Sequence, residues 1–179
     1  MPLSNPSPTP QTSSPEATPR VPRTSCLVLL LRAWWPALLW ASIIFTFSTD
    51  TFSSEHTSRI IVPLIQWLFP SISAESLDLA HHLVRKSAHF FEYFIFFLLL
   101  YHGIRATRRD RRPWHWTWAL GAWFIAAAYS ALDEIHQIFV PSRGPSAWDS
   151  LLDSTGALFA LLVLFFLYRR LFGPSPAVE

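Results

Sequence analysis

The sequence is poor in cysteine and in charged residues. Its 179 residues include a single cysteine, Cys26, which excludes an internal disulfide framework and any site built from several cysteine ligands. Asp, Glu, Lys and Arg make up 15% of the chain, whereas ordinary soluble domains contain roughly 25%. A mean hydropathy of +0.27 accompanies nine Trp and fifteen Phe. Because the apolar residues gather into blocks, the composition predicts a membrane protein with one domain.

Four apolar segments are long enough to cross a bilayer. They are residues 27–47, 87–104, 114–132 and 151–167. A helix rises about 1.5 Å per residue, so each segment can span most of a hydrocarbon core roughly 30 Å thick. A shorter apolar run, residues 60–69, contains Pro63 and is predicted to be interfacial or re-entrant, and a helix capped by Ser73 can continue into the second span. We therefore expect an all-α polytopic membrane protein with four transmembrane helices.

The two ends of the chain differ in composition from its apolar middle. Residues 1–26 are rich in Pro, Ser and Thr and are predicted to be a disordered tail. Residues 27–170 form the predicted membrane domain, and residues 171–179 a second short tail. No small-residue cleavage site follows the first apolar run, so the N-terminal segment does not have the pattern of a signal peptide.

Basic residues are distributed unequally between the two predicted sides of the membrane. Ten lie in or beside the tails and in the loop 105–113, and four lie on the other side. Those four are Arg59, Arg85, Lys86 and Arg143. Because Lys and Arg accumulate in cytoplasmic loops, we expect a multi-pass protein of the bacterial plasma membrane with both termini in the cytoplasm. Topology accounts for the arginine-rich loop, and no nucleic-acid recognition motif accompanies it, so no nucleic-acid partner is expected.

Polar residues interrupt the apolar segments on the side predicted to face outward. The second span begins HHLVRKSAHFFEY, residues 81–93, and most of its polar side chains fall within about 120° of one another on a helix. The third span ends, and the fourth begins, with a polar or small face: Ser130, Asp133, Glu134 and Gln137, then Asp149, Asp153, Gly156 and Ala160. Charged groups at this depth need protein or water partners. We therefore expect these residues to form one site at the outer leaflet.

Three sequence blocks resemble the signature blocks of the VanZ-like membrane protein family. They are FTFSTDTF (45–52), RKSAHFFEY (85–93) and ALDEIHQIFVPSRGPSAWDSLLDSTGA (131–157). Founding members of that family are linked to low-level antibiotic resistance against lipid-anchored glycopeptides such as teicoplanin. The resemblance, over about residues 45–168, implies a small inner-membrane protein of the cell envelope without an established reaction. By position, it implies the motif residues Ser48, Lys86, His89, Glu92, Tyr93, Asp133, Glu134, His136, Gln137, Arg143, Asp149 and Asp153.

Three functions are compatible with these residues. The first is binding of, or action on, amphiphilic or lipid-linked envelope molecules, with Ser48, Arg85, Tyr93, Gln137, Arg143, Asp149 and Asp153 as binding residues. The second is a membrane-embedded hydrolase or transferase, whose candidate catalytic residues are Lys86, His89, Glu92, Asp133, Glu134 and His136. These residues include groups that can act as a general acid, a general base and a cation, which such a reaction needs close together. The third is an ion-pair network that only holds the helices together. The sequence leaves open whether any reaction is catalysed.

No cofactor is expected, although one group of residues has ligands that suit a divalent metal ion. The group comprises Asp133, Glu134, His136 and Asp149, which supply oxygen and nitrogen donors. The order D-E-x-H differs from the H-E-x-x-H motif of zinc proteases. The expected partners are membrane lipids and a lipid-linked or amphiphilic envelope molecule.

Overall fold

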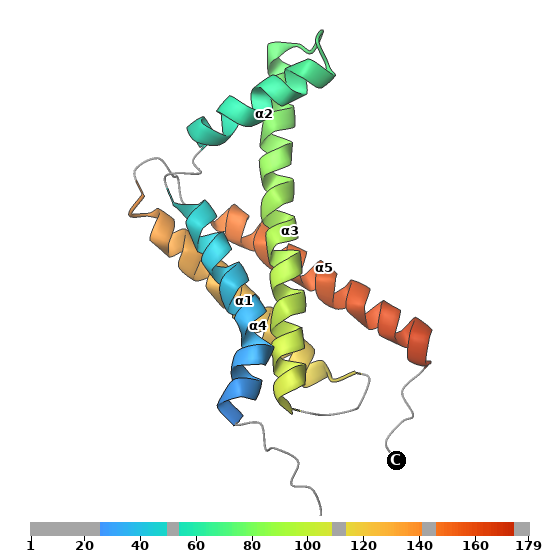
Figure 1. The fold of residues 1–179 in the computed structure, drawn as a ribbon. Helices are drawn as coiled ribbons and strands as arrows, with labels where there is room; N and C mark the ends of the chain where they lie inside the picture. The colour runs from blue at the N-terminus through green and yellow to red at the C-terminus, as the bar shows by residue number, and fades with distance from the viewer. Residues whose placement is uncertain (1–25, 50–53, 109–113, 141–145, 174–179) are drawn as a thin grey trace, which may run out of the picture.

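The computed structural model describes residues 26–49, 54–108, 114–140 and 146–173. Within these ranges the regular secondary structure is entirely α-helical (Figure 1), so the predicted all-α class is confirmed. The helices are α1 (Cys26–Ser48), α2 (Ser54–Leu68), α3 (Ala74–Arg108), α4 (Trp116–Gln137) and α5 (Ala147–Phe172). The predicted disordered tail, most of the second tail, three of the five loop arginines and Arg143 lie outside the described residues.

Helix α3 is much longer than the predicted second span. It has 35 residues and is therefore about 52 Å long. Its start is capped by Ser73, whose Oγ accepts a hydrogen bond from the N–H of Ser76 at 3.2 Å. The N-terminal part of α3 extends beyond α1, α4 and α5, and α2 lies beside that part (Figure 1). The predicted interfacial segment thus belongs to α2, which folds back along α3.

Helices α4 and α5 extend beyond the apolar segments that predicted them. The sequence predicts a span ending at residue 132, whereas α4 continues to Gln137. Similarly, α5 begins at Ala147 and continues to Phe172. Hydropathy underestimated both helices because charged residues occupy their ends. At the end of α4 the charged residues lie on a buried face, since Asp133 and Glu134 are buried together with the polar Ser130 and Gln137.

Small residues allow α3 and α5 to approach each other closely. A Cβ atom added at Gly156 would lie 2.3 Å from the carbonyl oxygen of Phe90. Ala157 and Ala160 of the same helix are also fully buried. Contact between small residues is a common way for helices to pack in membranes. The α3–α5 interface is accordingly the most extensive of the fold, and it fixes how the polar faces of these helices meet.

Hydrogen bonds from aromatic side chains connect the remaining helices. Tyr129 of α4 donates its hydroxyl proton to the carbonyl oxygen of Ala41 in α1, at 2.7 Å. Trp40 of α1 donates from Nε1 to the carbonyl oxygen of Glu92 in α3, at 2.9 Å. Trp123 of α4 likewise donates from Nε1 to the carbonyl oxygen of Ser154 in α5, at 3.1 Å. Because all three acceptors are backbone oxygens, these bonds connect the helices and leave the carboxyl groups available for other contacts.

Two of the described helices are long and apolar enough to be candidate membrane spans. They cover residues 27–48 and 147–172, which match the predicted first and fourth spans. The sequence predicts four such helices, and two of them are long and apolar enough along a single helix to be candidate spans. Helices α3 and α4 carry the predicted second and third spans within longer, more polar helices.

Candidate functional site

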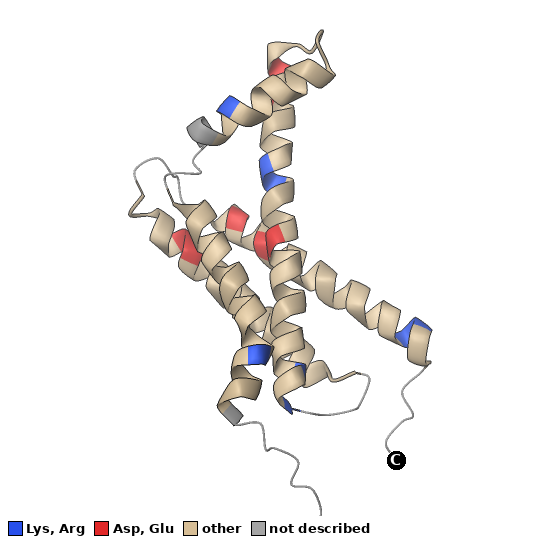
Figure 2. Ribbon diagram, viewed as in Figure 1, with Lys and Arg blue, Asp and Glu red and all other residues tan. Residues whose placement is uncertain are grey.

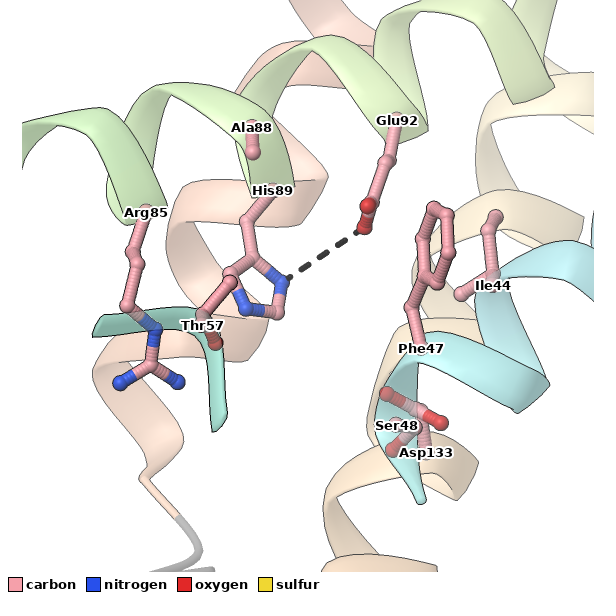
Figure 3. Close-up of a pocket in the computed structure, with 9 residues that line it drawn as sticks. All are labelled: Ile44, Phe47, Ser48, Thr57, Arg85, Ala88, His89, Glu92 and Asp133. Carbon is pink, nitrogen blue, oxygen red and sulfur yellow. Dashed lines mark ion pairs between the residues drawn. The ribbon is translucent and has the colours of Figure 1, made fainter. Parts of the chain in front are cut away.

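A partly open pocket of ≈ 210 Å³ lies where α1, α2, α3 and α4 come together. It is lined by Ile44, Phe47, Ser48, Thr57, Arg85, Ala88, His89, Glu92 and Asp133 (Figure 3). Among the described residues, the lining therefore combines one permanent cation, two carboxyl groups, an imidazole and two hydroxyls with an apolar wall. Pockets for small molecules usually combine an apolar surface with a few polar groups in this way.

The helical repeat explains why α1 and α3 place several residues in this pocket. On α3, Arg85, Ala88, His89 and Glu92 have the spacing i, i+3, i+4, i+7 and share one face. On α1, Ile44, Phe47 and Ser48 have the spacing i, i+3, i+4. Residues with these spacings lie one above the other on a helix. Asp133 comes from the end of α4 and Thr57 from the start of α2.

His89 lies near two acidic residues, Glu92 of its own helix α3 and Asp153 of α5. Its Nδ1 is 3.9 Å from Oε2 of Glu92 and 3.7 Å from Oδ1 of Asp153. Both distances are too long for hydrogen bonds, so these are ionic contacts when the imidazole is protonated. Glu92 lines the pocket, whereas Asp153 is not among the lining residues. His89 is thus the residue that joins the pocket to the buried carboxylate of α5.

Arg85 presents its guanidinium at one end of the pocket (Figure 3). Within the described ranges it forms no hydrogen bond or ion pair, although it lies in the field of Asp149. Burial lowers the pKa of Arg85, and the charge of Asp149 partly offsets that effect. Because guanidinium remains protonated at neutral pH even when its pKa falls, the side chain keeps its charge and its donors.

Ser48 and Asp133 line the opposite end of the pocket from Arg85 (Figure 3). Asp133 is 7% exposed and accepts a hydrogen bond from Nε2 of Gln137 at 3.1 Å. Ser48 is 3% exposed, and its Oγ has no hydrogen-bond partner among the described residues. A buried hydroxyl without a partner is costly. This end of the pocket therefore holds a buried polar atom that has no partner among the described residues.

A second group of polar residues connects α3, α4 and α5 outside the pocket. Lys86 forms an ion pair with Asp149. Ser130 donates to Oδ2 of Asp153 at 2.8 Å, and the backbone N–H of Ser146 donates to Oε2 of Glu134 at 2.7 Å. Burial raises the pKa of Glu134, and the Ser146 N–H partly offsets this. The polar residues expected in one site thus lie partly in the pocket lining and partly in this interhelical network, and His89 contacts members of both.

The chain was compared with models of known protein families, and one family model matches most of its length. The model of the VanZ/LLP1 family matches residues 33–168. The chain belongs to the VanZ/LLP1 family. The resemblance stated from the sequence blocks is thereby confirmed, and the matched region contains every residue that lines the pocket. No curated protein and no solved structure matches the chain.

The thirteen site residues predicted for this VanZ/LLP1 protein occupy several distinct places. Five line the pocket: Ser48, Arg85, His89, Glu92 and Asp133. Four take part in the interhelical network, namely Lys86, Glu134, Asp149 and Asp153, and Gln137 supports Asp133. Tyr93 is completely buried against Phe96, with ring centroids 6.2 Å apart. His136 packs against Phe45, with ring centroids 4.7 Å apart, and Arg143 lies outside the described residues.

Four pocket residues were not predicted from the sequence. Ile44, Phe47 and Ala88 share helix faces with predicted residues, since Ile44 and Ala88 precede Ser48 and Glu92 by four positions. Helical periodicity could therefore have found them. Thr57 had no comparable pattern, because it reaches the pocket through the packing of α2 on α3.

The arrangement of acidic and histidine residues bears on the metal and enzyme hypotheses. Among the residues that the structure describes, no three His, Cys, Asp or Glu side chains are grouped so that they could hold a metal ion. The predicted ligand set is divided, because Asp133 lines the pocket, Glu134 and Asp149 contact other helices, and His136 packs against Phe45. The hydroxyl of Ser130 is fully buried and bonded to Asp153, so it is not placed to attack a substrate.

Proposed function

We propose that this VanZ/LLP1 family protein binds the polar head of an amphiphilic or lipid-linked cell-envelope molecule in the pocket between α1, α2, α3 and α4. The observation that supports this most directly is the mixed lining of the pocket, in which charged residues face an apolar wall. Arg85 supplies donors, Glu92 and Asp133 supply acceptors, and Ile44 and Phe47 supply apolar surface. A molecule with a polar head and an apolar tail matches both parts of this lining.

The size of the pocket favours a head group over a whole lipid. Its volume of ≈ 210 Å³ is below the roughly 300–1,000 Å³ typical of pockets that enclose drug-sized ligands. Phe47 lines the pocket and is also 39% exposed at the surface of α1. We therefore place the tail outside the pocket, along the exposed apolar side chains of the helices, where lipid chains would also lie.

The proposal includes four membrane spans, with α3 and α4 crossing beside α1 and α5. Large apolar side chains are exposed on α3 and α4 as well, including Phe91, Ile95, Leu120, Phe124 and Leu132. Extensive apolar exposure indicates contact with lipid or with another protein. Neighbouring spanning helices would place this surface in the hydrocarbon core, where every backbone polar group must be bonded within a helix.

The distribution of charge supports an outward-facing pocket with both termini in the cytoplasm. Arg32, Arg105, Arg108, Arg169 and Arg170 lie toward the ends of α1, α3 and α5 that are remote from the pocket (Figure 2). Acidic segments of α4, α5 and the middle of α3 lie at the opposite level, near the pocket, and a further acidic segment lies at the N-terminal end of α3 (Figure 2). Because basic residues accumulate on the cytoplasmic side, the pocket belongs at the outer leaflet.

A binding function accounts for the pocket better than a purely structural role. The network of Lys86, Asp149 and Asp153 already connects the helices. Arg85 contributes nothing to that network through hydrogen bonds or ion pairs with described residues, yet it stands half-buried beside the pocket. A charged group at this depth is costly unless a partner or water compensates it, and the polar head of a ligand provides that partner.

A susceptibility assay tests the proposed function. Expression in a susceptible Gram-positive host should lower sensitivity to lipidated glycopeptides more than to non-lipidated ones. The difference should disappear in Arg85→Ala and Glu92→Ala at unchanged membrane abundance, because both residues line the pocket. The matched control is Arg59→Ala, an exposed arginine of α2 outside the pocket. Equal protection against both drug types, or full protection in both pocket variants, would contradict the proposal.

A further inference from the structure

Opposite charges occupy opposite ends of the pocket. Arg85 stands at one end, and Ser48 and Asp133 stand at the other, with Glu92 toward the Asp133 side and His89 in between (Figure 3). Lys86, the other basic residue of this part of α3, is engaged by Asp149 outside the pocket. Among the described residues that line the pocket, Arg85 is therefore the one permanently charged cation, and Figure 3 shows it apart from the two carboxyl groups.

We infer that the pocket recognises a head group that carries both a phosphate and a primary amine, as phosphoethanolamine does. The inference rests on the proposed function and specifies its ligand. The phosphate lies at Arg85, whose planar guanidinium can donate two parallel hydrogen bonds to phosphate oxygens. The amine lies at the opposite end, where Ser48, Asp133 and Glu92 offer oxygen atoms.

Neither a simple anion nor a simple cation matches this lining. A head group with phosphate alone would place its negative charge near Glu92 and Asp133, where like charges repel. An amine alone would leave the guanidinium of Arg85, which lies in the field of Asp149, without a hydrogen-bond partner among the described residues. A molecule with both charges pairs each end of the pocket with its opposite, so the desolvation of each charged group is compensated.

The acceptor end also distinguishes a primary amine from a quaternary one. A protonated primary amine has three N–H donors. The far end of the pocket provides two carboxyl groups and the hydroxyl oxygen of Ser48, which is buried and has no partner among the described residues. A trimethylated amine has no N–H donor, so it cannot donate to the carboxyl oxygens of Glu92 and Asp133. We therefore expect phosphoethanolamine lipids to bind more tightly than phosphocholine lipids.

Binding of short-chain lipids to the full chain in detergent tests this inference. The probes are dihexanoyl phosphatidylethanolamine, phosphatidylcholine and phosphatidylglycerol, with soluble phosphoethanolamine as a probe without a tail. The ethanolamine lipid should bind at least about tenfold more tightly than the other two lipids, a ratio typical for the loss of one charge-assisted hydrogen bond. Soluble phosphoethanolamine should bind more weakly than its lipid.

Substitutions at the two ends of the pocket should affect different probes. Arg85→Ala should weaken all three lipids, because each carries a phosphate. Asp133→Asn should weaken the ethanolamine lipid about tenfold and the choline lipid by less, because the quaternary amine loses only charge attraction and no hydrogen bond. Arg59→Ala and Asp78→Asn alter exposed residues outside the pocket and should change no affinity. If Asp133→Asn does not fold, Glu92→Gln replaces it in the same comparison.

The possible failures of the two proposals differ. Glycerol or choline lipids that bind as tightly as the ethanolamine lipid would overturn the inference about the head group while the amphiphile site stands. The same holds if Asp133→Asn weakens the choline and ethanolamine lipids equally. If no lipid binds, or if soluble phosphoethanolamine binds as tightly as its lipid, the proposed amphiphile function itself fails and the inference fails with it.

Discussion

Lys86 of α3 forms an ion pair with Asp149 in the first turn of α5, while the adjacent Arg85 lines the pocket. Successive residues of a helix point in directions about 100° apart, so these two basic residues meet different neighbours. Lys86 contributes to the contact between α3 and α5, and Arg85 contributes to the proposed ligand site. Two cations that are neighbours in the sequence therefore have separate roles that mutation can distinguish.

A double-mutant cycle should show that Lys86 and Asp149 stabilise the fold without affecting the ligand site. Lys86→Met and Asp149→Asn should each lower the free energy of unfolding by about 1 kcal/mol or less, because the pair is partly exposed. The double variant should lose less than the sum of the two. The measurement is unfolding in detergent, combined with the lipid-binding assay. Additive losses, or loss of lipid binding in Lys86→Met, would contradict these roles.

Substitution of Gly156 should disrupt the closest approach of α3 and α5. In Gly156→Ala the new Cβ would meet the carbonyl oxygen of Phe90 at 2.3 Å, so the helices must separate at a cost of roughly 1–3 kcal/mol. Gly121→Ala is the matched control, because nothing lies within 4 Å of a Cβ at Gly121, and alanine favours the helix. Thermal unfolding of both variants checks this. Equal stability of the two variants would argue against the close contact.

The stability of the protein should depend on the protonation of Glu134. Burial raises its pKa from the ordinary value of 4.5, and the Ser146 N–H opposes this only in part. The folded protein then keeps the proton at pH values where the unfolded chain has released it, so the free energy of unfolding falls as the pH rises above 4.5. Below that pH the contribution is fully present.

Glu134→Gln should remove this part of the pH dependence. Its amide oxygen can still accept the hydrogen bond from Ser146, so the variant should fold. Melting temperatures in a pH series that brackets 4.5 and extends to neutrality should show the wild type losing stability relative to the variant. Exposed Glu75 provides the control as Glu75→Gln. A wild type that gains stability relative to Glu134→Gln as the pH rises would show that the carboxylate is favoured by folding.

Cysteine labelling should reveal the orientation in the membrane. Ala147→Cys and Ala106→Cys, each in a Cys26→Ser background, place a thiol at exposed positions near the start of α5 and the end of α3. The distribution of basic residues predicts that an impermeant thiol reagent added to intact cells labels position 147 and spares position 106. Both should react after the cells are broken. The reverse pattern in intact cells would invert the topology.

The sequence alone determined the helices and their polar faces. The length of an apolar segment and the helical repeat are local properties, so the range 27–47 predicted both ends of α1 to within one residue and the range 114–132 predicted the start of α4 to within two. The same repeat predicted that Asp133, Glu134 and Gln137 share a face, and all three are buried. The three sequence blocks also predicted membership of the VanZ family, which the family model confirms. Helix ends were less well predicted, because hydropathy stops at the first charged residue although a buried charge can remain in a helix.

Only the tertiary structure decided which polar faces meet. The sequence predicted one polar cluster, and the rotation of α3 decides the place of each member in it: Lys86 pairs with Asp149 of α5, whereas Glu92 lines the pocket. That rotation depends on contacts between distant residues, such as Gly156 against the backbone of Phe90. Thr57 enters the pocket for a similar reason, since α2 folds back on α3. A periodic pattern fixes which side of a helix is polar, but the angle and depth of helix packing determine which polar residues share a pocket.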